Sequence, residues 1–259
     1  MPLNQSVEFS DRFFRQPPVA ALQLNPFEEL ALPFLRGAVL DVGCGMGNLA
    51  FAATARGCVV PALDASAAAI EHIRSRAAAE GWPQVILADL RRHPIEHDYD
   101  CVVSIGLLMF FDCVTALRVL ADLQARVRPG GHAVVNLLVQ GTTYADMFDP
   151  QQHCLLAPTA LQEHFAGWHI EYARLRDFAV PQGGPKRFAT VIAAKPLTEH
   201  SAAQVRESGK TGVCHQWSRS VRKADQVLMV GRHGPGIAVP RCKSCFHFAG
   251  EAASQLTGE

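Results

Sequence analysis

A loop with three glycines, in the stretch "VLDVGCGMGNLA" at residues 39–50, constrains the fold of this chain more than any other feature of its sequence. A short apolar run precedes the loop and a segment with helical spacing follows it, which predicts a turn from a buried strand into a helix. Glycines in such a turn let the backbone contact a ligand, and the free N–H groups of the helix start carry a partial positive charge. The order G-x-G-x-G differs from the G-x-G-x-x-G that holds a pyrophosphate. Taken alone, the loop fits either a ligand site or a tight packing turn.

The alternation of apolar runs and helical patterns continues to about residue 140. We expect strands at residues 37–43, 58–64, 84–90, within 99–111 and at 131–139, and helices at 47–57, 67–81 and 116–127. Strands separated by helices predict right-handed crossovers and a parallel, doubly wound sheet. Beyond it, the patterns predict a short helix and two strands that face each other across the turn at 181–185. The expected fold class is therefore α/β, a Rossmann-like and mostly parallel sheet with a C-terminal antiparallel hairpin.

Acidic residues end the second and third predicted strands. Asp64 lies about twenty residues after the glycine loop, where a carboxylate can accept hydrogen bonds from ribose hydroxyls. Asp89 ends the next strand at the same sheet edge, where it can accept from a base amino group. Each acid alone also fits a solvated strand end, but the two in succession favour a nucleoside-containing ligand.

The composition argues against nucleic-acid and membrane partners. Lys plus Arg equals Asp plus Glu at 24 each, so no overall basic field is present. The N-terminus lacks the pattern of a signal peptide, and no apolar run is long enough to span a bilayer. We expect a soluble, cytoplasmic protein with a small-molecule partner. Five scattered cysteines are then expected to be reduced core residues: Cys44, Cys58, Cys101, Cys113 and Cys154.

Taken together, "VLDVGCGMGNLA", "ALDAS", "ADL" and "RPGGHAVV" resemble the motif series of class I methyltransferases that use S-adenosylmethionine (SAM). The resemblance covers roughly residues 35–140. It implies that the loop glycines contact the methionine and ribose parts of SAM, that Asp64 binds the ribose, and that Asp89 with Leu90 frames the adenine. The implied cofactor-binding residues are Asp41, Gly43, Cys44, Gly45, Gly47, Asp64, Ala65, Asp89, Leu90 and Ile105.

A narrower resemblance involves "YDCVVSIGLLMFFD", "LQEHFAGWHI" and "KRFATVIAAK". These segments are similar to the tellurite-resistance methyltransferases, a group related to enzymes that act on thiols and on selenium or tellurium oxyanions. That group has a His-Arg pair before its last strand, whereas this chain reads "DFAVPQGGPK" there, with Arg187 at the matching arginine of "RFAT". Because the His-Arg pair is missing, the resemblance does not decide whether the substrate is an oxyanion.

Residues for the methyl acceptor are expected above the sheet, in the N-terminal helix and in the segments after the fourth and fifth strands. Tyr144 and Arg187 are the candidates for positioning the acceptor, because the polar ends of side chains in such segments often face a ligand. The apolar run "LLMFF" fits the core better than the pocket. We recognise no general base in the sequence, which favours an acceptor that arrives already ionised, as a thiol can.

The last part of the chain shows no sustained helical or strand period. We therefore expect a methyltransferase domain over residues 1–196 and a C-terminal extension over 197–259. Residues 201–259 of this extension contain eight Lys and Arg but only four Asp and Glu. The extension holds half of a zinc-binding pattern, with Cys214, Cys242, Cys245 and His247 as weak metal candidates. The alternative is an extension with free thiols and no metal.

These patterns predict an enzyme that transfers a methyl group from SAM to a small soft nucleophile, a thiol or a selenium or tellurium species. Methylation of nitrogen or oxygen on a small metabolite is the alternative within enzymes. A non-catalytic SAM-binding partner protein is the alternative from another class.

Overall fold

The computed structural model describes residues 5–16, 23–80, 84–143, 147–149, 152–179 and 184–197. The predicted acceptor residue Tyr144 lies outside the described residues. The same holds for the extension from residue 198 on, with its four metal candidates Cys214, Cys242, Cys245 and His247. The described residues contain no group of three or more His, Cys, Asp or Glu that could hold a metal ion.

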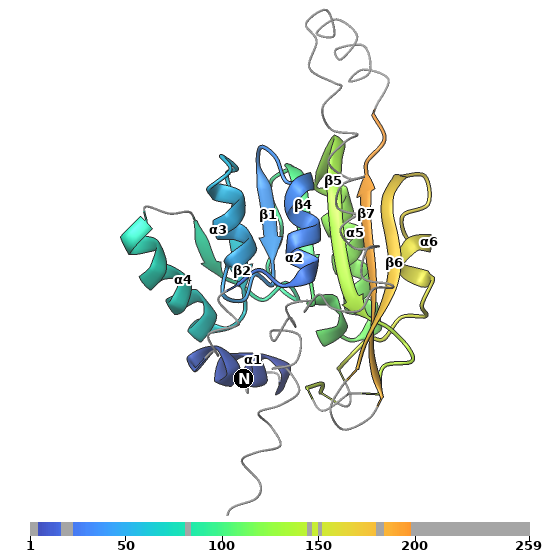
Figure 1. The fold of residues 1–259 in the computed structure, drawn as a ribbon, viewed down its shortest axis with the longest axis horizontal. Coiled ribbons are helices and arrows are strands. Elements are labelled where there is room, and N and C mark those ends of the chain that lie inside the picture. Colours follow the sequence, from blue (N-terminus) through green and yellow to red (C-terminus); the bar gives the residue numbers. More distant parts are fainter. Residues whose placement is uncertain are drawn as a thin grey trace, which may run out of the picture. The chain divides into compact units, whose positions relative to one another are not determined.

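A seven-stranded sheet forms the centre of the domain, in the order β3-β2-β1-β4-β5-β7-β6 (Figure 1). Its strands are β1 Val39–Val42, β2 Ala62–Asp64, β3 Val85–Leu87, β4 Tyr99–Ile105, β5 Val127–Leu138, β6 His169–Ala179 and β7 Pro185–Ala194. The first five pair in parallel, whereas β7 pairs antiparallel with both β5 and β6. The predicted parallel sheet with a C-terminal antiparallel hairpin is confirmed.

Helices cover both faces of this sheet. They are α1 Gln5–Arg15, α2 Pro26–Ala31, α3 Asn48–Thr54, α4 Ala67–Glu80, α5 Cys113–Ala125 and α6 Ala160–Glu163. In Figure 1, α2 lies in front of β4 and α5 lies behind β5. The buried face of α5 carries Ala116, Val119, Leu120 and Leu123 at helical spacing, which explains why this segment packs on the sheet.

Side-chain caps set the starts of two of these helices. Asn25 accepts hydrogen bonds from the N–H groups of Phe27 and Glu28, and the Glu28 carboxylate accepts from the N–H of Asn25 over 2.7 Å. This reciprocal capping box fixes the start of α2 and the direction of Glu28. Asp112 caps α5 by accepting from the N–H of Thr115 over 3.0 Å. As a result α5 begins three residues earlier than its predicted start at 116.

Glycines explain two other differences from the predicted elements. The strand expected within 99–111 ends at Ile105, because Gly106 has a φ of 72° and the chain turns there into a short 3-10 helix, Leu108–Phe110. The strand expected at 131–139 begins earlier, at Val127, and its pairing with β4 passes from Val127 directly to His132. The residues of β5 between these two positions have no partner in β4 and form a bulge in the strand.

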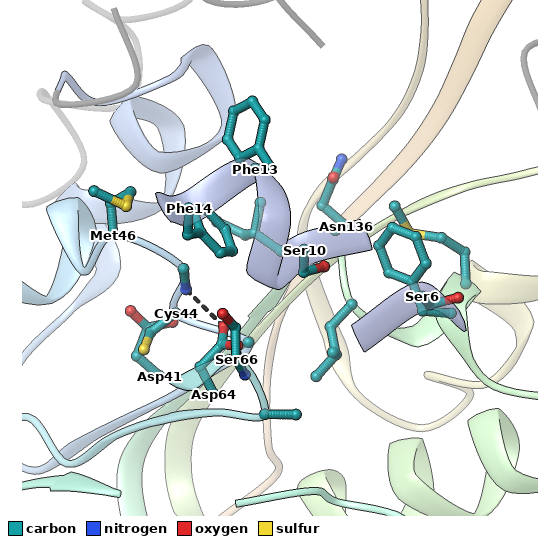
Figure 2. A pocket seen from close by; sticks show the side chains of 18 of the residues that line it. Ser6, Ser10, Phe13, Phe14, Asp41, Cys44, Met46, Asp64, Ser66 and Asn136 are labelled. Carbon is teal, nitrogen blue, oxygen red and sulfur yellow. Dashed lines mark hydrogen bonds between the residues drawn. The ribbon is translucent and has the colours of Figure 1, made fainter. Parts of the chain in front are cut away.

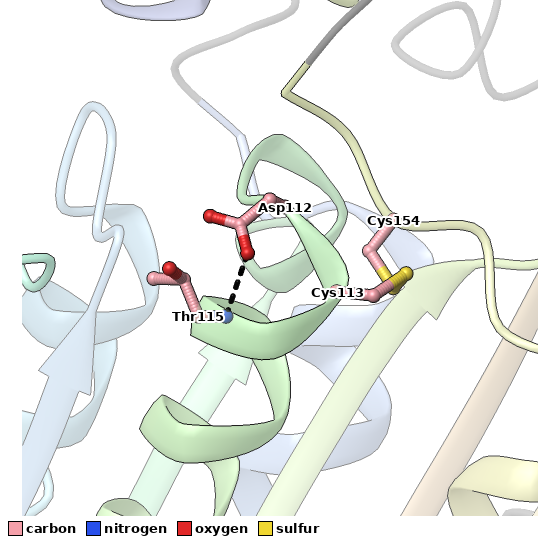
Figure 3. The surroundings of a disulfide bond; sticks show 4 residues. All are labelled: Asp112, Cys113, Thr115 and Cys154. Carbon is pink, nitrogen blue, oxygen red and sulfur yellow. Dashed lines mark hydrogen bonds between the residues drawn. A yellow bond between two sulfur atoms is a disulfide. The ribbon is translucent and has the colours of Figure 1, made fainter.

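Two of the five cysteines differ from the prediction. Cys44, Cys58 and Cys101 are buried and free, as expected, but Cys113 and Cys154 form a disulfide (Figure 3). The bond joins the first residue of α5 to the segment after β5, across 41 positions of sequence. The expectation of reduced thiols was wrong for this pair, because the fold brings together two residues that no local pattern relates.

Among the described residues, no helix has both the length and the apolar character needed to cross a membrane.

Candidate active site

The glycine loop connects β1 to α3 as predicted, and its shape depends on glycine. Gly43, Gly45 and Gly47 all have positive φ, of 69°, 51° and 70°. A Cβ on Gly45 would lie 3.1 Å from the Phe14 ring, and one on Gly43 would lie 2.9 Å from the Leu107 side chain. Side chains at these positions would therefore be both strained and crowded. Gly47 instead serves as the N-cap residue of α3 and does not line the cavity described below.

Asp64, at the end of β2, holds the glycine loop in place. Its carboxylate accepts a hydrogen bond from the N–H of Gly45 over 2.9 Å and another from the N–H of Ser66 over 2.8 Å. Burial raises the pKa of this carboxyl group, and these backbone hydrogen bonds act in the opposite direction. Figure 2 shows Asp64 and Asp41 on one side of the loop, with Phe13 and Phe14 of α1 on the other.

Asp41 and Glu28 are two acids at this end of the site whose pKa values are both raised. Burial, together with the nearby Glu28 and Asp64 carboxylates, raises the pKa of Asp41 to about 8. Burial likewise raises the pKa of Glu28 to about 7. None of the described residues is seen to donate a hydrogen bond to the Asp41 side chain. A cationic ligand group would therefore supply the counter-charge that this pair of acids lacks.

The predicted adenine end lies just after β3, whereas Ile105 of β4 was predicted beside the methionine part. Asp89 is held by Arg91 in a bidentate ion pair, with 2.6 Å between the Arg91 Nη2 and the Asp89 Oδ2. The guanidinium lowers the pKa of Asp89, although burial acts in the opposite direction. Asp89, Leu90 and Ile105 all line the same cavity as the glycine loop. Arg91 thus keeps Asp89 ionised and oriented at the cavity wall.

Helix α1 covers the cofactor end of the site. Its Asp11 accepts hydrogen bonds from the Ser66 hydroxyl over 3.0 Å and from the N–H of Ala68 over 2.9 Å, at the start of α4. The Ser66 hydroxyl also accepts a hydrogen bond from the N–H of Ala69 over 3.2 Å, as a helix cap does. Through Asp11, the first turn of α4 fixes the helix that places Phe14 over the loop.

One cavity of about 310 Å³ connects this cofactor end with a second, largely apolar compartment. Of the predicted cofactor residues, all but Gly47 line it: Asp41, Gly43, Cys44, Gly45, Asp64, Ala65, Asp89, Leu90 and Ile105. The residues of this second compartment, which we call the acceptor compartment, come from α2, the 3-10 helix after β4, the end of β5, residue 147, β6 and β7. Its apolar wall consists of Phe27, Met109, Phe110, Leu138, Met147, Phe178 and Phe188.

The predicted acceptor residue Arg187 does not line the cavity. Its guanidinium forms a bidentate ion pair with Asp177 on β6. The Nε–Oδ1 and Nη2–Oδ2 distances are both 2.8 Å. Successive residues of a strand point to opposite faces, so the neighbouring Lys186 lines the cavity instead. Met109 belongs to the buried core, as expected for "LLMFF", yet it also contributes to the cavity wall.

Glu28, Asn136 and Lys186 are among the polar residues of the cavity that were not identified from the sequence. The pattern N-x-x-E with a proline after the asparagine, at residues 25–28, is a capping-box signal that would have revealed Glu28. Asn136 lies within an apolar strand, and its Oδ1 is buried without a partner among the described residues. For Asn136 and Lys186 the sequence offers no local signal.

The residues present fit SAM. Its methionine amino group and its sulfonium are cations, and the buried acids Asp41 and Glu28 face the cavity that would receive them. The glycine backbone leaves room for a ligand where a Cβ would otherwise intrude. An anionic pyrophosphate, in contrast, would oppose the ionisation of the same acids.

Known families and proteins share sequence with this chain. Residues 39–131 match a family described as a methyltransferase domain. The chain is 30% identical over 168 residues to Hemagglutinin 1 of Eikenella corrodens, a match that covers 61% of this chain and 54% of that protein. It is 31% identical over 101 residues to tuberculostearic acid methyltransferase UfaA1 of Mycobacterium tuberculosis, covering 39% of this chain and 24% of that enzyme. The matches thus span about half or less of these relatives.

Solved structures share the fold. TehB from Haemophilus influenzae superposes with a TM-score of 0.59 at 20% identity, covering 72% of this chain and 67% of that one. The N-methyltransferase NodS from Bradyrhizobium japonicum, solved with S-adenosyl-L-homocysteine, gives a TM-score of 0.58 at 17% identity, covering 74% of this chain and all of that one. With the glycine loop and the acidic strand ends in their expected places, residues 39–131 match a methyltransferase domain, and the described chain shares the fold of these solved methyltransferase structures.

Proposed function

We propose that this protein transfers the methyl group of SAM to a small soft nucleophile, a thiol or a selenium or tellurium species. The observation that carries the proposal is the acceptor compartment itself, walled by phenylalanine rings and by the thioethers of Met109 and Met147. The described residues that line it include no histidine. Thioethers and aromatic rings suit a polarisable nucleophile, and the lack of a histidine base among these residues favours an acceptor that is ionised before it binds.

Bound SAM supplies an electrophilic methyl group on a positively charged sulfur. The acceptor's lone pair forms the new bond to the methyl carbon while the carbon–sulfur bond of the cofactor breaks, and that bonding pair stays on the cofactor sulfur. The protein's part is to hold the acceptor in line and to exclude water. Phe14 and the rest of α1 cover the cofactor end, and the rings of Phe27 and Phe188, with centroids 4.8 Å apart, pack over the acceptor end.

A screen of methyl transfer tests this proposal. Purified protein would be incubated with SAM and with thiols, selenite, tellurite and amines in separate reactions, and the products would be identified by mass spectrometry. Methylated thiol or selenium products are expected, at a rate whose pH dependence follows the pKa of the acceptor. SAM binding without transfer to any acceptor would favour the non-catalytic, SAM-binding alternative.

Methylation of a nitrogen or oxygen is a second candidate, favoured by a specific observation. Glu28, with its pKa raised to about 7, lines the cavity and can take a proton from an amine near neutral pH. The Oδ1 of Asn136 can accept a hydrogen bond from the same acceptor group. Under this alternative Glu28→Gln would slow transfer to amines by about 100-fold or more, whereas transfer to thiols would be little changed.

We further propose a small molecule, and neither a nucleic acid nor a membrane, as the partner of this site. The largely apolar and aromatic lining of the compartment supports this view, as does the absence of an overall net charge. The cytoplasmic location expected from the sequence stays a prediction. The Cys113–Cys154 disulfide weighs against it, because disulfides are rare in a reducing compartment.

A further inference from the structure

The side-chain amide of Asn136, on β5, is buried at the cavity wall with only one of its two polar atoms paired. Asn136 is 0% exposed and lines the cavity (Figure 2). Its Nδ2 donates hydrogen bonds to the Thr190 Oγ1 over 2.8 Å and to the Ala189 carbonyl oxygen over 3.4 Å, both on β7. Its Oδ1 has no partner among the described residues. A buried oxygen that is left unpaired costs free energy, so its place in a ligand cavity calls for an explanation.

The contacts with β7 fix which end of the amide is unpaired. The carbonyl oxygen of Ala189 can only accept a hydrogen bond, so the amide atom that faces it is the donor, Nδ2. Rotating the amide by half a turn would bring two acceptor oxygens together. Oδ1 therefore points away from β7, and Thr190, which is itself only 2% exposed, holds the amide in this orientation.

The register of the sheet places Asn136 between the two ends of the cavity. Asn136 pairs with Thr190 of β7 on one side and with Ile105 of β4 on the other. Ile105 also lines the cavity and is the residue predicted beside the methionine part of SAM. Leu138, two residues further along the same face of β5, belongs to the acceptor compartment. Asn136 thus lies one strand spacing, about 4.8 Å, from Ile105, where the cofactor end meets the acceptor compartment.

An amide oxygen at this position selects for a particular kind of ligand group. It is a neutral hydrogen-bond acceptor, so an N–H or O–H group pairs with it, whereas an apolar group leaves it unpaired. A site with a buried polar atom discriminates against analogues that lack the matching partner, because the atom then stays unsatisfied. The rest of the compartment is largely apolar, so a single polar contact weighs heavily in the choice of ligand.

We propose that Asn136 determines specificity by accepting, at Oδ1, a hydrogen bond from an N–H or O–H group of the methyl acceptor. The methyl acceptor is then a small molecule that carries such a donor close to its nucleophilic atom, as a hydroxythiol does. The inference rests on the proposed function, since it assumes that the compartment receives a methyl acceptor. It assigns Thr190 the role of a positioning residue, because Thr190 contacts the amide of Asn136 and acts through it.

Steady-state kinetics with two thiols of equal size test the inference. Mercaptoethanol ends in a hydroxyl group where propanethiol ends in a methyl group, so only mercaptoethanol can donate to Oδ1. The wild-type protein should favour mercaptoethanol by about 10-fold or more in kcat/KM, and Asn136→Leu should reduce this preference to about 3-fold or less. Thr190→Val, which removes one group that orients the amide, should lower the preference by a smaller factor. A wild-type protein without this preference would overturn the inference, whether or not the variants fold.

Ser104→Ala is the matched control. Ser104 is also 0% exposed on a central strand, and its Oγ likewise has no partner among the described residues, but Ser104 does not line the cavity. This variant should keep the preference for mercaptoethanol. Equal losses for the two thiols in Asn136→Leu would overturn the inference and make Asn136 a structural residue. A matching loss of affinity for S-adenosylhomocysteine would also overturn it, by assigning Oδ1 to the cofactor.

Binding measurements separate this inference from the proposed function. If the wild-type protein methylates no thiol or selenium species, the proposed function fails. Saturation-transfer NMR of the two thiols with protein loaded with S-adenosylhomocysteine then decides the role of Asn136. Mercaptoethanol binding that is lost in Asn136→Leu but kept in Ser104→Ala supports the inference. Mercaptoethanol that binds the wild-type protein no more tightly than propanethiol, or not at all, refutes it.

Discussion

The carboxylate of Asp64 accepts a hydrogen bond from the backbone N–H of Gly45 over 2.9 Å, which ties the end of β2 to the glycine loop. Asp64→Ala should therefore weaken SAM binding by about 1 to 3 kcal/mol, through the lost loop contact and the lost acceptor for ribose hydroxyls. Isothermal calorimetry measures this change. Unchanged affinity in a folded variant would remove Asp64 from the cofactor site.

The buried acids predict that cofactor binding releases protons. The pKa of Asp41 is raised to about 8 and that of Glu28 to about 7, so both hold protons near neutral pH in the empty protein. The cationic amino group shared by SAM and S-adenosylhomocysteine favours the ionised acids, so affinity should rise with pH between about 6 and 9. Calorimetry of S-adenosylhomocysteine in buffers of different ionisation enthalpy counts the protons released. Asp41→Asn should release fewer, and an identical count would contradict the assignment.

The same raised pKa values predict how stability varies with pH. An unfolded chain loses these protons near pH 4, whereas the folded protein keeps them until about pH 7 to 8. Between these limits the folded state binds more protons, so the free energy of unfolding should fall as the pH rises. Thermal unfolding from pH 5 to 9 should show this slope, and it should be shallower in Asp41→Asn. A slope equal to that of the wild type would contradict the prediction.

The disulfide should stabilise the domain substantially. Cys113 and Cys154 close a loop across 41 positions, for which chain entropy predicts a loss of about 2 to 4 kcal/mol when the bond is removed. The double variant Cys113→Ala, Cys154→Ala should unfold at a lower temperature and should no longer respond to a reductant. A reductant-dependent shift that persists in the double variant would point to another source.

Asp11 should control how long the cofactor stays bound. It joins α1 to the start of α4 through Ser66 and Ala68, and the hydrogen bond from the Ala68 N–H lowers the pKa of Asp11. Loss of this cap costs about 1 kcal/mol, so Asp11→Ala should speed dissociation of SAM by roughly 5-fold. Stopped-flow displacement measures the rate. Glu8→Ala, an exposed acid on the same helix, should leave the rate unchanged.

The sequence alone determined the parallel sheet, the glycine loop and the acidic ends of β2 and β3. Each of these follows from short-range patterns, namely the spacing of apolar residues and the placing of glycine after a strand. Asp41, Asp64 and Asp89 could be located because the ends of parallel strands meet at one sheet edge.

Only the tertiary structure decided which side chains meet across the chain. It directs Lys186 to the cavity and Arg187 to Asp177, a choice set by the register of β7 against β6. It also pairs Cys113 with Cys154. Burial raises the pKa of Glu28, and no local apolar pattern in the sequence predicts that burial. These features depend on packing between segments that are distant in the sequence, and local periodicity carries no information about such contacts.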